Sequence, residues 1–528
     1  MHRATGGGIV GRRRRAWEDT TLRRSKLFLL LPVFALVLQA CGTRLPNSAF
    51  VKAQQGSNAS NQASAGDQSG GVTDQSGGVG GTAQSATSGG STSGGSSTGG
   101  GATGTGASSS GGGSTGGGAN GPNTASDIGV TPSSIKIGNI TSIGGSFGPD
   151  AFSPSLYGLE SFVSSVNARG GVNGRKIDFH TCDDNDTGDQ NLTCAQQLVE
   201  QQKVFAMIGN NSESSARSAS YTNSKGVPDL GLPLNNGYYK YPTMFSFYGA
   251  GGAVRDGKQV GAQGKNWQPT GQYRWMKQQR GIDRGAVFFY SIAVSQQQGY
   301  AVEANFGAEG IQQVYEGGGS HSGENFAAPS FDTDVVNMQQ KQVQGIWDAM
   351  DVAGNQKLCA AMDRRGFTVK AKVSTIEVWG QKVGSDFSSP CRNTVFSQGV
   401  SDPYSDKGNP IVSQFLSDFN KYQPGRQLHQ WSLEGWAMGY EFSKAAATMG
   451  PNLTRAGWMK WLNDLNNYTL DGLVAPFDYK QYNYNAPYHD CFSVVQWSDP
   501  DKTFKTVTPI TTCYEAKWIG YTPSNDGA

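Results

Sequence analysis

The sequence predicts an α/β protein whose folded part has two lobes and is preceded by a disordered tether. From about residue 134 onward, short apolar runs alternate with amphipathic helical patterns, which is typical of mostly parallel sheets covered by helices on both faces. The alternation comes in two sets, separated by an irregular stretch at 249–266. Before them, residues 42–126 are almost all Gly, Ser, Thr, Gln, Asn and Ala, and this composition cannot offset the entropy lost on folding.

The first set opens with a strand at 135–140, followed by a helix. Apolar residues recur at helical spacing from Leu156 to Val166, and Gly170-Gly171 ends the pattern. The other elements of this set are strands at 177–181 and 204–208 and a helix at 190–202. The second set follows 273–280 and predicts helices at 298–308, 335–341 and 355–364, with strands at 286–290, 311–315, 343–347 and 376–382.

The N-terminus has the features of an export signal. A basic stretch precedes an apolar stretch at 27–38, which at about 12 residues is far shorter than the ~20 needed for a permanent membrane helix. Leu38-Gln39-Ala40-Cys41 resembles the lipobox of bacterial lipoproteins, which implies cleavage before Cys41 and acylation of its thiol. Two acyl chains hold a protein to a membrane. A chance cysteine behind an ordinary secretion signal is the alternative.

The charge balance excludes one class of partner. The chain has 43 Lys and Arg against 41 Asp and Glu, a net charge of +2. Removing residues 1–40 takes away eight basic and two acidic residues and leaves 35 against 39. Because the mature protein is slightly acidic, we expect no nucleic-acid partner.

Six cysteines remain besides Cys41, and an even number in an exported chain predicts disulfides. Many connectivities are possible, but the order in close pairs favours Cys182 with Cys194, Cys359 with Cys391, and Cys491 with Cys513. A metal site is the rival interpretation. No CxxC spacing occurs and the five His are scattered, so we expect neither a metal nor a cofactor.

Several runs of the first set carry a family resemblance. They are Ile135-Lys136-Ile137-Gly138, the stretch from Val166 through Gly170-Gly171-Val172-Asn173-Gly174 to Ile177, Cys182-Asp183-Asp184-Asn185-Asp186, and Met207-Ile208-Gly209. They resemble the type I periplasmic binding proteins, in the branch of the Leu/Ile/Val and amide receptors of ABC transporters. The similarity covers about 133–480. Asp183 and Asp184, at a strand end, are expected to cap backbone amides as scaffold.

The resemblance implies two Rossmann-like lobes joined by a hinge. Lobe 1 is expected at 130–250 plus about 395–485, and lobe 2 at 251–394 plus about 486–528, after a signal peptide at 1–40 and a tether at 41–126. The implied function is that of a monomeric substrate-binding lipoprotein on the extracellular face of the membrane, held by lipid on Cys41. It would bind a small polar solute, an amino acid, amide or related metabolite, and deliver it to an ABC permease. A receptor of the same fold that signals to a membrane partner is an alternative.

The resemblance places the ligand between the lobes, at strand ends and helix N-termini. The implied ligand-binding residues are Ser212, Ser214 and Asn235 in the first lobe, Gln298, Asp351 and Gln381 in the second, and Phe147 and Phe152 as an apolar or stacking wall. Each has a structural alternative, because Ser and Asp cap helices, Asn favours turns and Phe packs in cores.

The sequence departs from the amino-acid receptors of this family at two positions. Gln381 or Lys382 falls where those receptors present a carboxylate to the ligand ammonium, and Glu213 in the first-lobe loop would repel a ligand carboxylate. An amide, a peptide-like compound or another small polar metabolite is therefore an alternative to an amino acid.

One motif suggests an enzyme instead. Gly144-Gly145-Ser146-Phe147-Gly148 fits the G-x-S-x-G elbow of serine hydrolases and follows a predicted strand. In that fold, however, several strands precede the elbow and a helix starts directly after the serine. Here only the tether precedes the first strand, the next helix starts near Leu156, and the candidate bases His429 and His489 have no recognisable context. We expect no enzyme.

Overall fold

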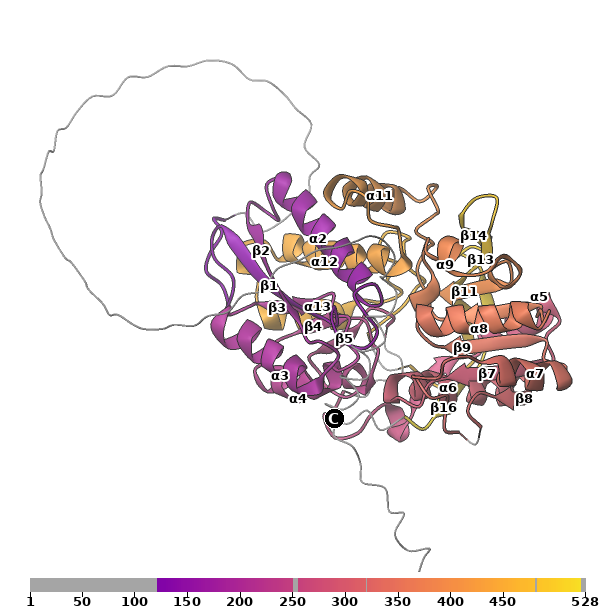
Figure 1. Cartoon of the computed structure of the whole chain (residues 1–528). Coiled ribbons are helices and arrows are strands. Elements are labelled where there is room, and N and C mark those ends of the chain that lie inside the picture. The colour runs from indigo at the N-terminus through magenta and orange to yellow at the C-terminus, as the bar shows by residue number, and fades with distance from the viewer. Residues whose placement is uncertain (1–120, 250–254, 320, 480–481, 524–528) are drawn as a thin grey trace, which may run out of the picture. The chain divides into compact units, whose positions relative to one another are not determined.

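The computed structural model describes residues 121–249, 255–319, 321–479 and 482–523. These residues form two halves, each built on one large β-sheet (Figure 1). The predicted signal peptide at 1–40, the lipidation site Cys41 and the predicted tether up to residue 120 lie outside the described residues. Within the described ranges, no helix combines the length and the apolar character needed to cross a membrane.

A parallel five-stranded sheet forms the core of the first half, with strand order β2-β1-β3-β4-β5. Parallel neighbours require crossover connections, and helical segments provide them here. The strands are β1 (Ser134–Thr141), β2 (Lys176–Asp183), β3 (Ala206–Ile208), β4 (Asp229–Gly231) and β5 (Met244–Ser246). The crossover segments are α2 (Ser153–Ala168), α3 (Gly188–Gln196) with the π-helical turn Gln197–Gln201, α4 (Ser215–Ser224) and the 3-10 turn Asn236–Tyr239.

A seven-stranded sheet forms the second half, in the order β14-β13-β11-β10-β9-β7-β8. The pairs among β7 to β11 are parallel, whereas β13 and β14 join antiparallel at one edge. The strands are β7 (Arg284–Phe289), β8 (Gln312–Glu316), β9 (Gly345–Ala349), β10 (Ala371–Ser374), β11 (Val395–Gly399), β13 (Ser493–Ser498) and β14 (Thr503–Thr508). Helix α5 (Gly271–Arg280) precedes these strands, and the helices between them are α6 (Ala293–Glu309), α7 (Asp332–Gln340), α8 (Val352–Arg364), α9 (Val383–Asp386) and α10 (Ser389–Arg392).

The chain returns to the first half after β11. Three helices, α11 (Pro410–Tyr422), α12 (Gln430–Met449) and α13 (Arg455–Asp464), follow there, and α12 packs along α2 (Figure 1). The two helices approach at Gly158 and Gly435: a Cβ at Gly158 would lie 1.8 Å from the Ser432 oxygen, and one at Gly435 would lie 1.9 Å from the Ser155 oxygen. Only glycine permits so close a backbone approach.

The last segment belongs to the second half and adds two small sheets to it. β12 (Tyr488–Cys491) pairs with β15 (Cys513–Ala516), and β16 (Trp518–Tyr521) pairs antiparallel with β6 (Asn266–Pro269). The remaining short 3-10 turns are Ala262–Gly264, Ile376–Val378 and Gly450–Asn452. The predicted disulfides are confirmed: Cys182–Cys194 joins β2 to α3, Cys359–Cys391 joins α8 to α10, and Cys491–Cys513 joins β12 to β15.

The predicted strand at 376–382 is wrong. β10 already ends at Ser374, and Val378 and Trp379 then donate their amides back to Thr375 and Ile376, so the chain turns instead of extending. At the other end of the fold, part of the expected tether contacts folded residues. Thr124 donates to the Pro451 oxygen at 3.0 Å, and Asn123 donates to the Asn173 oxygen at 2.8 Å.

Candidate functional site

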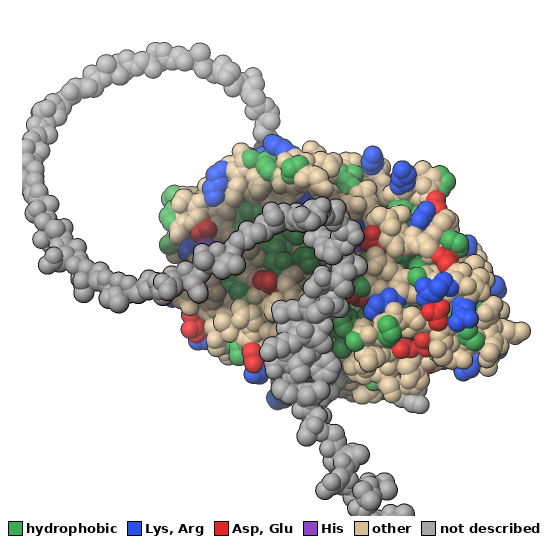
Figure 2. All heavy atoms as spheres, viewed as in Figure 1, with side chains coloured by type: hydrophobic (Ala, Val, Ile, Leu, Met, Phe, Trp, Pro, Cys, Tyr) green, Lys and Arg blue, Asp and Glu red, His purple; other side chains and the backbone are tan. Residues whose placement is uncertain are grey.

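A cavity of about 390 Å³ lies at the carboxyl ends of the parallel strands of both sheets. Its wall includes Phe147 after β1, Glu213 after β3, Tyr290 after β7, Asp351 after β9 and Glu377 after β10. Parallel strands end at the same edge of their sheet, which brings these separate loops together. Figure 2 shows apolar side chains gathered in a hollow of the described surface, with an acidic side chain among them.

Asp351 is the most firmly positioned carboxylate of the wall. It caps α8, where its Oδ1 accepts a hydrogen bond from the Gly354 amide at 2.8 Å, as an N-cap residue does. The same oxygen accepts the phenolic proton of Tyr290 at 2.8 Å. Gly354 leaves the necessary space, because a Cβ there would lie 1.9 Å from the Tyr290 hydroxyl. The predicted capping role of Asp351 and its place on the cavity wall are therefore compatible.

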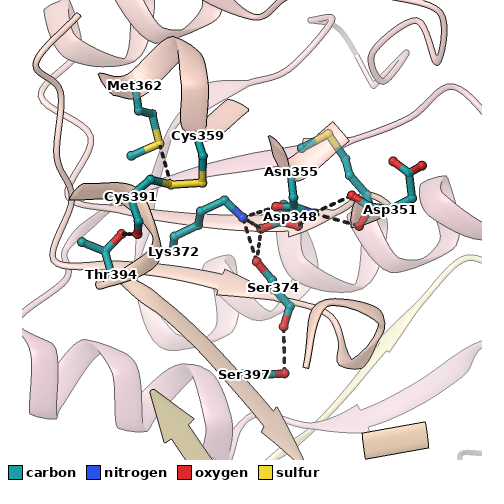
Figure 3. Close-up of polar contacts among 11 residues, drawn as sticks. Asp348, Asp351, Asn355, Cys359, Met362, Lys372, Ser374, Cys391, Thr394 and Ser397 are labelled. Carbon is teal, nitrogen blue, oxygen red and sulfur yellow. Dashed lines mark hydrogen bonds and ion pairs between the residues drawn. A yellow bond between two sulfur atoms is a disulfide. The ribbon is translucent and has the colours of Figure 1, made fainter. Parts of the chain in front are cut away.

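A buried polar network holds the loop that carries Asp351 (Figure 3). Lys372 and Asp348 are fully buried and form an ion pair of 2.6 Å, and Lys372 also donates to Ser374 at 2.7 Å. Asn355 donates to Asp348 at 2.8 Å and to the Asp351 main-chain oxygen at 3.0 Å. Because Asp348 neutralises it within the network, Lys372 supplies no free positive charge to the cavity.

Glu377 reaches the cavity from the 3-10 turn after β10, and the start of α12 fixes this turn. His429 Nε2 lies 2.9 Å from the Glu377 main-chain oxygen, and Nδ1 accepts from the Trp431 amide at 3.0 Å. Burial lowers the pKa of His429 to about 4, so the neutral ring is the form that bridges these groups. The Glu377 Oε1 atom is buried and has no hydrogen-bond partner among the described residues.

Glu213 lies in the loop before α4, and its neighbours hold that loop. Asn235 donates to the Glu213 main-chain oxygen at 3.2 Å and to Ser215 at 2.6 Å. Ser212 donates to Asp184, which also accepts from Ser142 and Asn191. Ser212 and Asn235, which were expected to bind the ligand, therefore form hydrogen bonds within the protein. Glu213 is the residue of this loop that lines the cavity.

The carboxylates of the wall act on one another. Burial and the negative charges of Asp186, Asp184 and Asp351 raise the pKa of Glu213 well above its usual value. Burial and the charges of Asp351 and Glu213 do the same for Glu377. A fourth carboxylate of the wall, Asp490, has its pKa raised to about 7 by burial. The site therefore concentrates acidic groups that destabilise one another's charged forms.

Aromatic side chains form most of the rest of the wall. Near the first half, Phe152 stacks on Trp431 with ring centroids 5.8 Å apart, and Phe147 meets Phe152 edge to face. The segment after residue 481 contributes Trp518 and Tyr482, whose stacked ring centroids lie 5.1 Å apart. Within the described ranges, none of the lining residues is Lys, Arg or His.

Four of the residues expected to bind the ligand line the cavity: Phe147, Phe152, Gln298 and Asp351. Ser212, Ser214, Asn235 and Gln381 are not among the lining residues. Gln381 instead accepts a hydrogen bond from the Leu428 amide at 2.9 Å. Glu377, Tyr290 and Trp431 also line the cavity but were not predicted as site residues. The sequence signal that could have indicated them was their position near a strand end or a helix start. The aromatic residues after 480 were missed as well, although their density in the sequence marks that segment.

The candidate nucleophile Ser146 is exposed in the loop between β1 and α2. The next helix starts at Ser153, so no sharp turn into a helix presents the serine. Both ring nitrogens of His429, a candidate base, form hydrogen bonds with the backbone, one with the Glu377 oxygen and one with the Trp431 amide. Asp183 accepts from the amides of Ile143 and Gly144 at 3.0 and 3.2 Å, which is the predicted scaffold role.

One group in the described part of the chain has metal-ligand geometry away from the cavity. Glu303, Glu316 and His321 bring one ligand atom each within 4.8 Å of one another. His321 Nδ1 lies 2.8 Å from a Glu303 oxygen, so an ion pair between these two side chains accounts for their approach when His321 is protonated.

A two-sheet α/β fold with a cavity at the strand ends defines a class of ligand-binding protein. The chain belongs to the periplasmic binding protein family, whose family model matches residues 134–503. The predicted family resemblance and fold class are thereby confirmed. A search of curated proteins finds no match to this chain.

Solved structures with the same fold cover most of the described chain. The fatty acid ABC transporter substrate-binding protein from Thermomonospora curvata has a TM-score of 0.57 at 14% identity, over 74% of this chain and 94% of that one. The solute-binding protein from R. palustris in complex with 4-hydroxybenzoate has 0.55 at 15%, over 74% and 98%. The branched-chain amino acid transporter protein LivJ from Streptococcus pneumoniae in complex with isoleucine has 0.54 at 13%, over 73% and 99%.

Proposed function

We propose that this protein is the extracellular solute-binding lipoprotein of an ABC importer, which closes on a small polar solute and delivers it to the permease. The observation that carries the proposal is the cavity at the carboxyl ends of both sheets. Its volume of about 390 Å³ is within the range of small-molecule sites, ~300–1,000 Å³. The similar structures named above, two of them with small ligands, support the same function.

The proposed lobes follow the two sheets, and closure would be a hinge motion between them. One exposed ion pair already joins them: Lys382, after the turn that carries Glu377, contacts Asp150, in the loop that carries Phe147. A solute that contacts both lobes only in the closed form would shift the equilibrium towards closure.

The test is a melting-temperature screen of the purified protein with amino acids, amides, small peptides and sugars. A solute that binds the folded state raises the melting temperature, because it stabilises the protein by RT ln(1 + [L]/Kd). If no compound of these classes stabilises the protein, and neither choline nor phenethylamine does so, the transport proposal fails.

The lipid anchor is proposed from the sequence around Cys41, outside the described residues. In a bacterial host, a Cys41→Ser variant should leave the membrane fraction, whereas the parent chain should remain there and carry acyl groups detectable by mass spectrometry. Equal membrane retention of both proteins would contradict the anchor and leave the binding proposal unaffected.

A further inference from the structure

We propose that the solute is an organic ammonium ion: a protonated amine or a quaternary ammonium group on an apolar body. This inference rests on the proposed binding function and adds the chemical class of its ligand. It starts from the charge of the wall, where Glu213, Asp351 and Glu377 come from both sheets and face the same space. Besides burial, the charge of Asp351 raises the pKa of both Glu213 and Glu377, and the charge of Glu213 also raises the pKa of Glu377.

The buried acceptors of this cluster are not all used within the protein. The Glu377 Oε1 atom is buried on the cavity wall without a hydrogen-bond partner among the described residues. An unpaired buried acceptor costs free energy that a ligand donor recovers. A protonated amine between the carboxylates would supply both the missing donor and the missing counter-charge, and a quaternary ammonium group would supply the counter-charge.

The nearby cations are already paired elsewhere. Lys372 is held by Asp348, Ser374 and Asn355 in the buried network, and Lys382 contacts Asp150 on the surface. Because the described lining residues include no Lys, Arg or His, a ligand carboxylate or phosphate would meet carboxylates without a cationic partner. The wall therefore disfavours anions and gives a zwitterionic amino acid a partner for only one of its two charges.

The aromatic wall suits the rest of such a ligand. Trp and Tyr faces attract ammonium groups, by roughly 0.5–2 kcal/mol for each well-placed ring. Phe152, Trp431 and Tyr290 line the cavity together with the carboxylates, and Trp267, Tyr482 and Trp518 also line it. Quaternary ammonium groups, which cannot donate hydrogen bonds, bind in sites of this composition.

Part of this wall lies outside the segment that matches the family model. The family match ends at residue 503, whereas β16 supplies Trp518 and Tyr521 to the cavity. β16 is held there by pairing with β6, opposite Trp267. The aromatic side of the cavity thus depends on residues outside the matched part of the family, and a ligand unlike those of the structural relatives is consistent with that.

Two pairs of probes test the charge of the ligand at fixed shape. Choline is compared with its neutral isostere 3,3-dimethylbutan-1-ol, and phenethylamine with the anion 3-phenylpropanoate; isoleucine serves as the zwitterion. We expect at least one cation to raise the melting temperature of the full mature protein and to bind at least about tenfold more tightly than its partner by calorimetry. Equal or tighter binding of the neutral, anionic or zwitterionic probe would overturn the inference and leave the binding function intact. No binding by any cation would overturn it as well.

Variants connect the binding to the carboxylates. Glu377→Gln and Glu213→Gln should each weaken binding of the better cation at least about tenfold, while 3,3-dimethylbutan-1-ol is unaffected. Asp464→Asn, at an exposed residue paired with Lys460, is the matched control and should bind as the parent does. The unliganded glutamine variants should melt no lower than the parent, because each replaces a carboxyl group whose charged form is already disfavoured with a neutral amide of the same shape. Unchanged cation affinity in both glutamine variants would contradict the proposal.

Discussion

Tyr290 donates its phenolic proton to Asp351 at 2.8 Å, which links the end of β7 to the start of α8 at the wall of the cavity. Both residues are buried, and the second donor to the same oxygen is the Gly354 amide. One hydroxyl therefore fixes the orientation of the carboxylate that faces the proposed ligand.

Removing that hydroxyl should have a local cost. We expect Tyr290→Phe to lower the free energy of unfolding by about 1–2 kcal/mol, because it removes a hydrogen bond to a buried carboxylate. Urea denaturation measures the change. Tyr440→Phe is the control, since it removes a similar bond, to Asp471 at 2.7 Å, at an exposed site; a loss there as large as at Tyr290 would show that burial does not decide the effect.

The Lys372–Asp348 ion pair should be strongly coupled. Lys372→Met leaves a buried unpaired carboxylate, and we expect it to cost about 3–5 kcal/mol of unfolding free energy. Lys372→Met combined with Asp348→Asn should cost less than the sum of the two single changes. The exposed pair of Lys444 and Asp471 serves as the control, with an expected cost below about 1 kcal/mol for Lys444→Met. Strict additivity at the buried pair would contradict the network.

The stability of the unliganded protein should fall as the pH rises from about 4 to about 8. Burial raises the pKa of Asp229 and Glu434 to about 7 and that of Glu441 to about 8. Between the usual carboxyl pKa and these values the folded state holds protons that the unfolded chain has released, so each rise in pH favours unfolding until the folded groups also ionise. His429 acts in the opposite direction, but only between its folded pKa of about 4 and its usual value.

Glu441→Gln isolates one of these groups. Glu441 is fully buried in α12, and its Oε2 has no hydrogen-bond partner among the described residues. We expect the variant to unfold like the parent near pH 5 and to be more stable by at least about 1 kcal/mol near pH 9. A variant whose advantage does not grow with pH would show that this carboxyl group is not protonated in the folded protein.

Affinity for the ammonium probe should rise as the pH rises above the usual pKa of a glutamate. Glu213 faces Asp184, Asp186, Asp351 and Glu377, and Glu377 also faces Asp348 and the neutral His429. Burial and these acidic neighbours raise the pKa of both glutamates, so a cation that binds their charged forms displaces protons. Calorimetry in buffers of different ionisation enthalpy would detect the release, and binding that is independent of pH and buffer would argue against it.

The fold could be predicted from the sequence further than the site could. Buried parallel strands and amphipathic helices leave periodic patterns, and the cysteine pairs were close enough in sequence to be matched. Asn235 and Ser212 show the limit of such a prediction. Each is polar, lies after a strand and suits a ligand, yet each donates a hydrogen bond to a neighbouring loop of the protein. Which way such a side chain points depends on partners such as Asp184, which spacing does not reveal.

The missed residues have the same physical origin. Glu377 was expected in a strand, but the turn after β10 and the contact with His429 present it to the cavity. Trp518 lies far in sequence from the strand ends that the family resemblance emphasises, and only the pairing of β16 with β6 brings it to them.

The position of β16 has a consequence for biosynthesis. This strand is made after all strands of the two large sheets, so both sheets can fold while part of the cavity wall is still missing. If a carboxypeptidase removed the residues after Cys513, the chain would keep both large sheets and its three disulfides but lose Trp518 and Tyr521. We expect such a product to have a circular dichroism spectrum close to that of the full chain and to bind the proposed solute more weakly.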